Sequence, residues 1–240
     1  MARAPLVSCI MPTCDRRRFV RRSLRYWRRQ EYAFRELVVV DSGIEPIVDL
    51  LPRDPSVRYQ RATPGLSLGA ARNLACTAAR GAYIAHWDDD DWMAPSRLRH
   101  QVGALDASTA QVCGLGTLTY LDRGRARAWR YTPGPHDPPW LAGGTLVYRR
   151  EAWEGHPFRD VTVGEDGAFL AGLAPDHLLA LPDEGWYVAA LHAGNTSSRP
   201  VGDDRWSPVD PRDLITRMRH LTTCPARQRT ARSDPVETLH

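Results

Sequence analysis

The sequence predicts an α/β fold with a central, mostly parallel sheet. Two apolar runs, residues 6–11 and 36–40, are typical of buried strands, and residues 18–29 between them carry apolar side chains at helical spacing. A strand, a helix and a second strand at this spacing indicate a right-handed βαβ unit. The chain has 240 residues, enough for one such domain with a full hydrophobic core.

The later elements continue this pattern. After a flexible turn at residues 65–69, the alanine-rich segment 70–80 is predicted as a helix that Gly81 ends as a C-cap. Further strands are expected at residues 57–60, 82–85, 111–121, 127–131, 143–148, 178–181 and 187–191. Further helices are expected at residues 95–105, 150–154, 164–170 and 210–221, and the proline-rich segment 132–140 is expected to be a loop.

The composition is that of a soluble protein. The hydrophobic fraction is 42%, and no apolar run reaches the roughly 18–20 residues that a membrane-spanning helix needs. The N-terminus lacks the apolar core of a signal peptide, so we expect a cytoplasmic protein that could also visit a membrane surface. Five scattered cysteines indicate reduced thiols, and the polar segment 223–240 is expected to be a flexible tail.

Arginine supplies all the basic charge apart from histidine, because the chain has no lysine. The net charge is +4, too small an excess to imply nucleic-acid binding by itself. Many of the arginines cluster on the predicted helix at residues 18–29 and just before it, at Arg16 and Arg17. We interpret them as a solvated helix face, with a nucleic-acid or lipid surface as the alternative.

Four consecutive aspartates, Asp88 to Asp91, follow the predicted strand at residues 82–85. Neighbouring carboxylates repel each other by about 4 kcal/mol per pair at an effective dielectric constant near 20. Two flanking tryptophans and a buried strand argue against a simple solvated turn. Because hard cations bind carboxylate oxygens, the cluster predicts a divalent metal site.

Polar residues also follow two other predicted strands, at residues 12–15 and at Asp41. In an open parallel sheet, ligands bind beyond the carboxyl ends of the strands, so these groups should line one crevice with the aspartates. Arg72, on the helix after a glycine-rich turn, adds a cation to the same edge. Carboxylates for a metal and an arginine together suit a sugar linked to a nucleoside diphosphate.

Four segments together resemble family 2 glycosyltransferases of the GT-A fold. They are VSCIMPTCDR (residues 7–16), LVVVDSG (37–43), GAARN (69–73) and GAYIAHWDDDD (81–91), and GEDG (164–167) is similar to that family's "ED" motif. The resemblance implies a nucleotide-binding half at residues 1–105 and an acceptor-binding, catalytic-base half at residues 106–222. It further implies inverting transfer of a sugar from a nucleotide-diphosphate sugar, UDP-sugar favoured, with Mn²⁺ or Mg²⁺.

The same resemblance assigns roles to single residues. Asp90 matches the metal ligand of the Asp-x-Asp motif, and Asp89 fills its variable middle position. Asp91 would support the metal ligand without contacting the metal. Asp166 matches the catalytic base. The nucleotide or its diphosphate would contact Pro12, Thr13, Asp15, Asp41, Arg72, Asp88 and Asp89.

Asp166 also fits this role on chemical grounds. Inversion needs a carboxylate, standing apart from the metal, to take the proton of the acceptor hydroxyl. The alternative is that Glu165 or Asp166 only caps the following helix. His192 is either a further metal ligand or a hydrogen-bonded loop histidine.

The sequence leaves the acceptor open. A glycan, a lipid-linked sugar, a natural product, a peptide or a modified nucleic acid each offers a hydroxyl, and some of the tryptophans Trp129, Trp140, Trp153, Trp186 and Trp206 could line its site. Ser42 stands where relatives of the family often carry a second acid, which leaves the identity of the donor's nucleobase open. A Gln-x-x-Arg-Trp motif of processive synthases is absent from the sequence, favouring transfer of a single sugar.

Two other classes of function fit the sequence less well. A nucleotidyltransferase ranks low, because such enzymes generally place a lysine on phosphate and this chain has none. The non-enzymatic alternative is a sugar-nucleotide-binding module or an arginine-rich nucleic-acid-binding module.

Overall fold

The computed structural model describes residues 4–137, 140–196 and 201–223, so most of the predicted tail lies outside the described residues. Its strands are β1 (Val7–Thr13), β2 (Arg35–Asp41), β3 (Val57–Arg61), β4 (Tyr83–His86), β5 (Trp92–Met93), β6 (Val112–Leu115), β7 (Leu118–Asp122), β8 (Arg127–Tyr131), β9 (Val147–Arg149), β10 (Leu178–Leu181), β11 (Tyr187–Ala190) and β12 (Trp206–Val209). Its α-helices are α1 (Arg17–Arg28), α2 (Leu68–Ala78), α3 (Arg97–Asp106), α4 (Arg150–Gly155), α5 (Glu165–Ala171) and α6 (Pro211–Thr223). Three short 3₁₀ helices are η1 (Val48–Leu50), η2 (Gly143–Thr145) and η3 (Pro175–His177).

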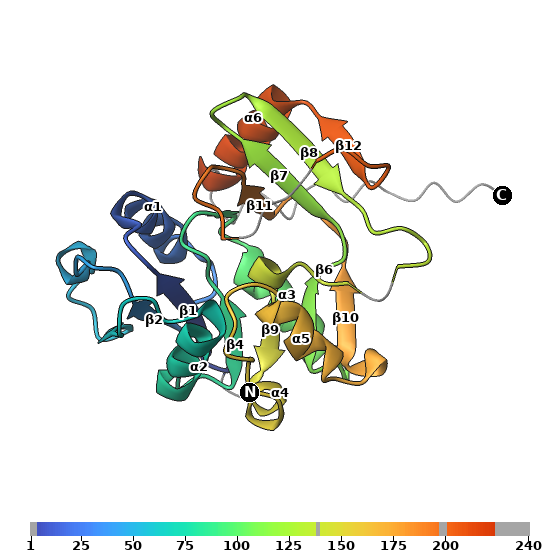
Figure 1. Ribbon diagram of the computed structural model, residues 1–240. Coiled ribbons are helices and arrows are strands. Elements are labelled where there is room, and N and C mark those ends of the chain that lie inside the picture. Colours follow the sequence, from blue (N-terminus) through green and yellow to red (C-terminus); the bar gives the residue numbers. More distant parts are fainter. Residues whose placement is uncertain (1–3, 138–139, 197–200, 224–240) are drawn as a thin grey trace.

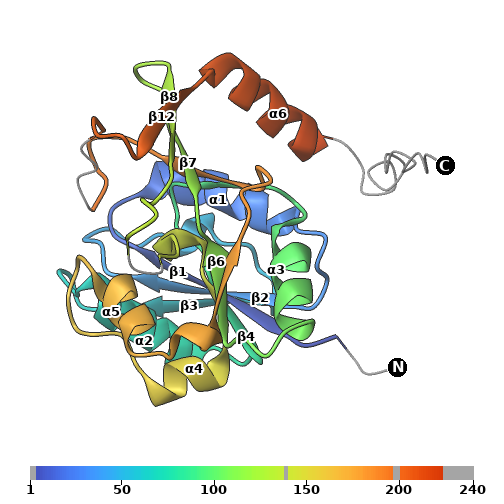
Figure 2. The same ribbon diagram turned by 90° about the vertical axis from the view of Figure 1, so that its right-hand side faces the viewer.

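The main sheet has seven strands in the order β10-β6-β9-β4-β1-β2-β3, and β9 alone runs antiparallel to its neighbours. Helices α1 and α3 cover one face, while α2, α4 and α5 cover the other (Figure 2). The central strand β1 is therefore buried on both faces, with Cys9 and Met11 in one core cluster and Ile10 in the other. This arrangement confirms the predicted α/β class with a mostly parallel sheet.

A second sheet of five strands, in the order β12-β8-β7-β11-β5, lies above the main sheet together with α6 (Figure 1). Strands β7 and β8 pair antiparallel around residues 122–127. Strand β11 fixes the segment just after the aspartates to the second sheet, since it pairs with β7 on one side and with β5 on the other.

Three local predictions were wrong. The segment 111–121 forms two strands in different sheets, because β6 joins the main sheet and β7 the second. The predicted strand at residues 143–148 begins as the 3₁₀ turn η2, and strand β9 starts only at Val147. Gly81 is not a helix cap: α2 ends at Ala78, and a side-chain Cβ at Gly81 would lie 2.6 Å from the Leu6 carbonyl oxygen.

Candidate functional site

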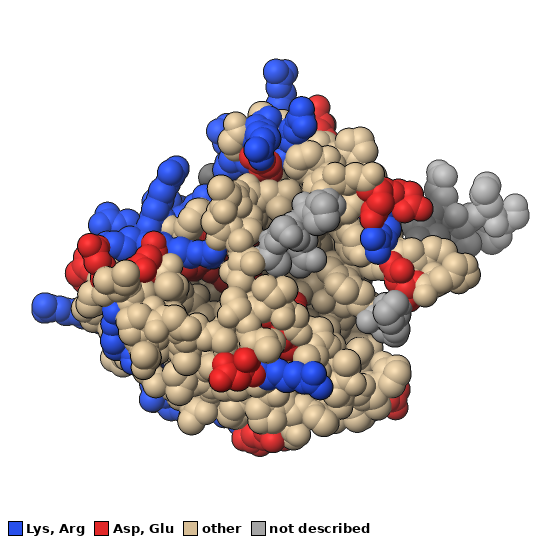
Figure 3. Space-filling view, in the orientation of Figure 1, with Lys and Arg blue, Asp and Glu red and all other residues tan. Residues whose placement is uncertain are grey.

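A cavity of about 800 Å³ lies between the carboxyl ends of β1 and β4, the start of α5 and the second sheet. Its lining includes Pro12, Arg72, Asp166 and all four aspartates, Asp88 to Asp91. Figure 3 shows acidic surface inside a recess near the middle of this face, while arginines gather over α1 and the upper layer. The predicted crevice therefore exists, although Asp41 is not part of it.

The four aspartates divide into two pairs with different surroundings. Asp89 is 2% exposed and accepts hydrogen bonds from the Thr13 hydroxyl at 2.6 Å and from Arg16 at 3.1 Å. Asp91 accepts from the Tyr187 hydroxyl and from the Ala190 backbone N–H. Asp89 and Asp91 thus anchor the loop to β1 and β11, which leaves Asp88 and Asp90 as the pair available to a ligand.

Holding this much negative charge in one buried loop is costly. Burial, with the neighbouring Asp90, raises the pKa of Asp89 to about 7. Burial also raises the pKa of Asp91 and that of Asp88. A cation bound beside these carboxylates would offset the cost.

Asp90 and His192 are brought together from distant parts of the chain. The His192 Nε2 atom lies 3.0 Å from Asp90 Oδ2, and the His192 ring stacks on Phe19 with centroids 4.6 Å apart. A carboxylate oxygen and an imidazole nitrogen side by side are donors that would suit a divalent ion such as Mg²⁺ or Mn²⁺. Within the described residues no group of three His, Cys, Asp or Glu could hold a metal, so ligand and water oxygens would complete the shell.

The assignment of every arginine near α1 to a solvated face was wrong. Arg16 contacts both Asp89 and Asp90, at 3.1 and 3.0 Å, and donates to the Gly194 carbonyl oxygen. Arg22 donates to the Asp90 backbone carbonyl at 2.6 Å. Burial alone would lower the pKa of Arg16, but Asp89 and Asp90 raise it. Arg16 lies three residues beyond the end of β1, and its position in the sequence does not show that its side chain turns toward the aspartates.

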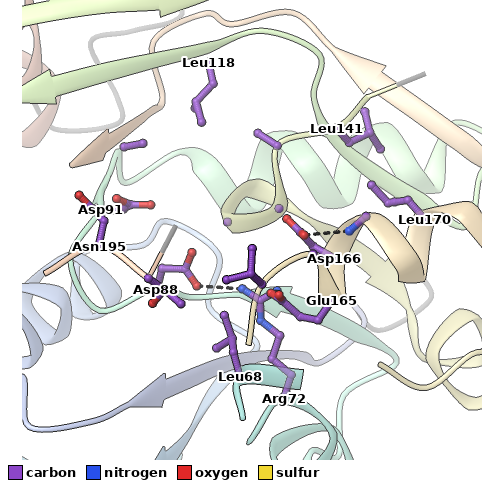
Figure 4. Close-up of a pocket in the computed structure, with 18 of the residues that line it drawn as sticks. Leu68, Arg72, Asp88, Asp91, Leu118, Leu141, Glu165, Asp166, Leu170 and Asn195 are labelled. Atoms are coloured by element: carbon purple, nitrogen blue, oxygen red, sulfur yellow. Dashed lines mark hydrogen bonds and ion pairs between the residues drawn. The ribbon is translucent and has the colours of Figure 1, made fainter. Parts of the chain in front are cut away.

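Arg72 lies 3% exposed between two carboxylates. It pairs with Glu165 at 2.6 Å and with Asp88 at 3.4 Å (Figure 4). Glu165 is the first residue of α5, so this contact joins α2, the aspartate loop and α5. Arg72 was predicted at the site, whereas Glu165 was expected only to cap the helix.

Asp166 projects into the cavity from the second position of α5 (Figure 4). The turn η2 lies against it: a Cβ at Gly143 would sit 1.7 Å from Asp166 Oδ2, and a Cβ at Gly144 would sit 2.6 Å from Asp88 Oδ2. Two glycines are therefore needed where the backbone passes both acids. His86 contacts the Gly143 carbonyl oxygen at 2.7 Å, and Arg97 donates to that of Gly144 at 3.2 Å.

The remaining predicted nucleotide contacts lie at different depths. Pro12 lines the cavity, and Thr13 lies behind it. Asp15 lies beside a smaller hollow, with its carboxylate accepting from the Ile44 backbone N–H at 2.7 Å.

The predicted contact between Asp41 and the nucleotide does not fit the surroundings of this residue. It is fully buried, and its oxygens accept from the backbone N–H groups of Gly43 and Ile47 and from the Tyr59 hydroxyl. Arg61 lies 3.0 Å away and completes this set of partners. Asp41 therefore supports the loop after β2, and the structure offers none of its oxygens to a nucleotide.

The mostly parallel sheet, with acids at its strand ends, defines a protein of the GT-A type. The model of glycosyl transferase family 2 matches residues 8–160, more than half of the chain, and the chain belongs to this family.

The matches to curated relatives cover only part of each chain. The chain is 39% identical over 87 residues to the succinoglycan biosynthesis protein ExoO of Rhizobium meliloti (strain 1021), covering 35% of this chain and 25% of ExoO. It is 30% identical over 106 residues to an uncharacterized glycosyltransferase of Haemophilus influenzae, covering 42% of each. The matches span between 25% and 42% of the length of such relatives.

Solved structures share the fold. TarS residues 1–349 of S. aureus, in complex with UDP-GlcNAc, superposes with a TM-score of 0.63 at 18% identity, covering 93% of this chain and 69% of that one. The mannosyltransferase PcManGT of Pyrobaculum calidifontis, with GDP-Man and Mn²⁺, gives 0.59 at 21% identity, covering 79% and 57%. These likenesses confirm the GT-A fold. No helix among the described residues is long and apolar enough to cross a membrane.

Proposed function

We propose that this protein is a metal-dependent, inverting glycosyltransferase that moves one sugar from a nucleotide-diphosphate sugar, UDP-sugar favoured, to a hydroxyl acceptor. One observation carries the proposal. Asp90 and Asp166 line the same cavity, and His192 lies beside Asp90, although the three residues come from distant parts of the chain. Membership of family 2 supports it, as do the nucleotide sugars held by structural neighbours.

The donor would lie at the charged end of the cavity. Pro12 and Asp88 would contact the nucleoside, and Arg72 and Arg16 would face the diphosphate. Asp90 and His192 would hold Mn²⁺ or Mg²⁺, and when bound the ion supplies positive charge for the departing diphosphate. The division into a donor half, residues 1–105, and an acceptor half, residues 106–222, remains part of this proposal, although β6, β9 and β10 join the main sheet from the second half.

Asp166 would act as the general base. Its carboxylate takes the proton of the acceptor hydroxyl, and the hydroxyl oxygen then attacks C1 of the sugar on the face opposite the leaving diphosphate. That attack inverts the configuration at C1. Because the η2 turn separates Asp166 from Asp88, the base stands apart from the carboxylates that serve the donor.

Calorimetric titration of UDP with and without Mn²⁺ tests this function. We expect binding that depends on Mn²⁺, and we expect His192→Ala to weaken it about tenfold or more, because one of two protein ligands is lost. The exposed His136 provides the control, and His136→Ala should bind as the unaltered chain does. Salt-sensitive nucleic-acid binding without affinity for UDP would instead support the arginine-rich binding module.

A further inference from the structure

The cavity has two ends of different chemistry. Ionisable side chains surround the aspartate loop at one end. Beyond Asp166, the described lining is apolar and consists mainly of Trp140, Leu141, Leu170, Leu173 and Leu178. In Figure 4, Leu141 and Leu170 lie on the opposite side of Asp166 from Asp88 and Arg72. An acceptor that reaches Asp166 from this side therefore meets hydrocarbon surface.

This apolar wall is unsuited to a sugar chain. Each hydroxyl of a glycan that leaves water needs a new hydrogen-bond partner, and leucine side chains provide none. Leu141 and Leu170 are 3% and 7% exposed, so the wall is continuous with the packed core. A hydrocarbon body gains free energy from the same surface, because its own apolar area leaves water.

The wall continues to the outside of the molecule. Val163 lines the cavity on the loop just before α5 and is 63% exposed, an unusual position for a valine. It is one of five large hydrophobic side chains recorded as exposed in the described part of the chain, and Val161 on the same loop is another. Val163 thus places apolar surface at the edge of the cavity, three positions before Asp166.

Aromatic rings on the same wall favour a flat partner. Trp140 and Tyr120 both line the cavity, and each packs against a further ring, Tyr131 at 5.0 Å and Trp206 at 5.1 Å between centroids. Rings held in this way are rigid, and their faces or edges suit another aromatic ring.

We propose that the acceptor is an aromatic alcohol, a hydroxyl carried on a flat, hydrocarbon-rich ring system; this inference rests on the proposed function. Asp166 takes the proton of that hydroxyl, and the oxygen forms a bond to C1 of the donor sugar. The bond from C1 to the phosphate oxygen breaks, and the nucleoside diphosphate leaves with its electron pair. The ring system occupies the leucine-lined end beside Trp140.

The test measures UDP release by the full chain with Mn²⁺, over a panel of UDP-sugars and three acceptors: 2-naphthol, 1-octanol and maltose. We expect release above the slow hydrolysis rate with 2-naphthol, and a KM about tenfold or more below that for maltose. Equal or better use of maltose overturns the inference, and preference for 1-octanol overturns it in favour of an alkyl chain. If no nucleotide sugar is bound or hydrolysed, the proposed function fails and the acceptor inference falls with it.

A pair of variants locates the acceptor site. Val163→Asn replaces apolar surface at the cavity edge by an amide of similar size, and it should raise the KM for 2-naphthol about tenfold. Val161→Asn makes the same change on the same loop outside the cavity lining, and it should leave that KM unchanged. An equal KM for 2-naphthol in Val163→Asn and the unaltered chain would contradict this placement of the ring.

Discussion

Arg72 and Glu165 form a buried ion pair that joins two helices at the site, and each residue is 3% exposed. Such a pair offers little net stability relative to an apolar substitute, but removing one partner leaves the other charge uncompensated. Asp88, at 3.4 Å, is the remaining counter-charge to Arg72. The integrity of the charged end of the cavity therefore depends on Glu165.

We expect Glu165→Gln to lower the free energy of unfolding by about 3 kcal/mol, because it removes the charge that compensates Arg72. Urea unfolding measures this change. The exposed Glu154, in α4, is the control, and Glu154→Gln should leave the midpoint unchanged. A Glu165→Gln variant as stable as the Glu154→Gln variant would show that Asp88 alone compensates Arg72.

Single residues were predictable where their chemistry is visible in a short stretch. Four adjacent aspartates show a site without any knowledge of the fold, and the structure places His192 beside one of them. Arg16 was not predictable, because an arginine on a polar helix end has the same pattern whether it faces water or Asp90. The need for glycine at Gly143 and Gly144 was missed, because it comes from the close approach of their backbone to Asp166 and Asp88, which lie in distant segments of the chain.

Strands and helices with long apolar runs were predicted well, while short turns were not. β1, β2 and α1 follow directly from buried runs and helical spacing. Gly81 was misassigned because the sequence does not show which backbone passes close to it. The close approach of residues 6–8, and not a left-handed helix end, requires glycine there.

Glycines 81 and 103 should respond to alanine in opposite directions. At Gly81 the new methyl group would meet backbone atoms of Leu6 and Ser8 at 2.6 and 2.7 Å, so Gly81→Ala should destabilise the fold by about 2 kcal/mol. At Gly103, an exposed position within α3, it meets nothing within 4 Å, and Gly103→Ala should stabilise by about 0.5–1 kcal/mol. Thermal unfolding measures both changes, and a shift of the same sign in the two variants would contradict this explanation.

Across the whole molecule, the fold class was predictable but the assembly of the site was not. Strands β6, β9 and β10 come late in the chain and enter the main sheet beside β4, which brings Asp166 over the strand ends. Such pairings join segments far apart in sequence, and no local periodicity reports them. The second sheet then closes the cavity from above and adds Leu118 and Tyr120 of β7 to its lining.

The proposed division of labour places donor binding on Asp90 and His192, and proton removal on Asp166. The measurement is to compare Asp166→Asn with the unaltered chain, both for Mn²⁺-dependent UDP binding and for sugar transfer. We predict UDP affinity within about twofold and transfer slowed about 100-fold or more, because a carboxamide cannot take the acceptor's proton. Asp90→Ala should instead lose the metal-dependent binding. Undiminished transfer by Asp166→Asn would contradict the assignment of Asp166 as the base.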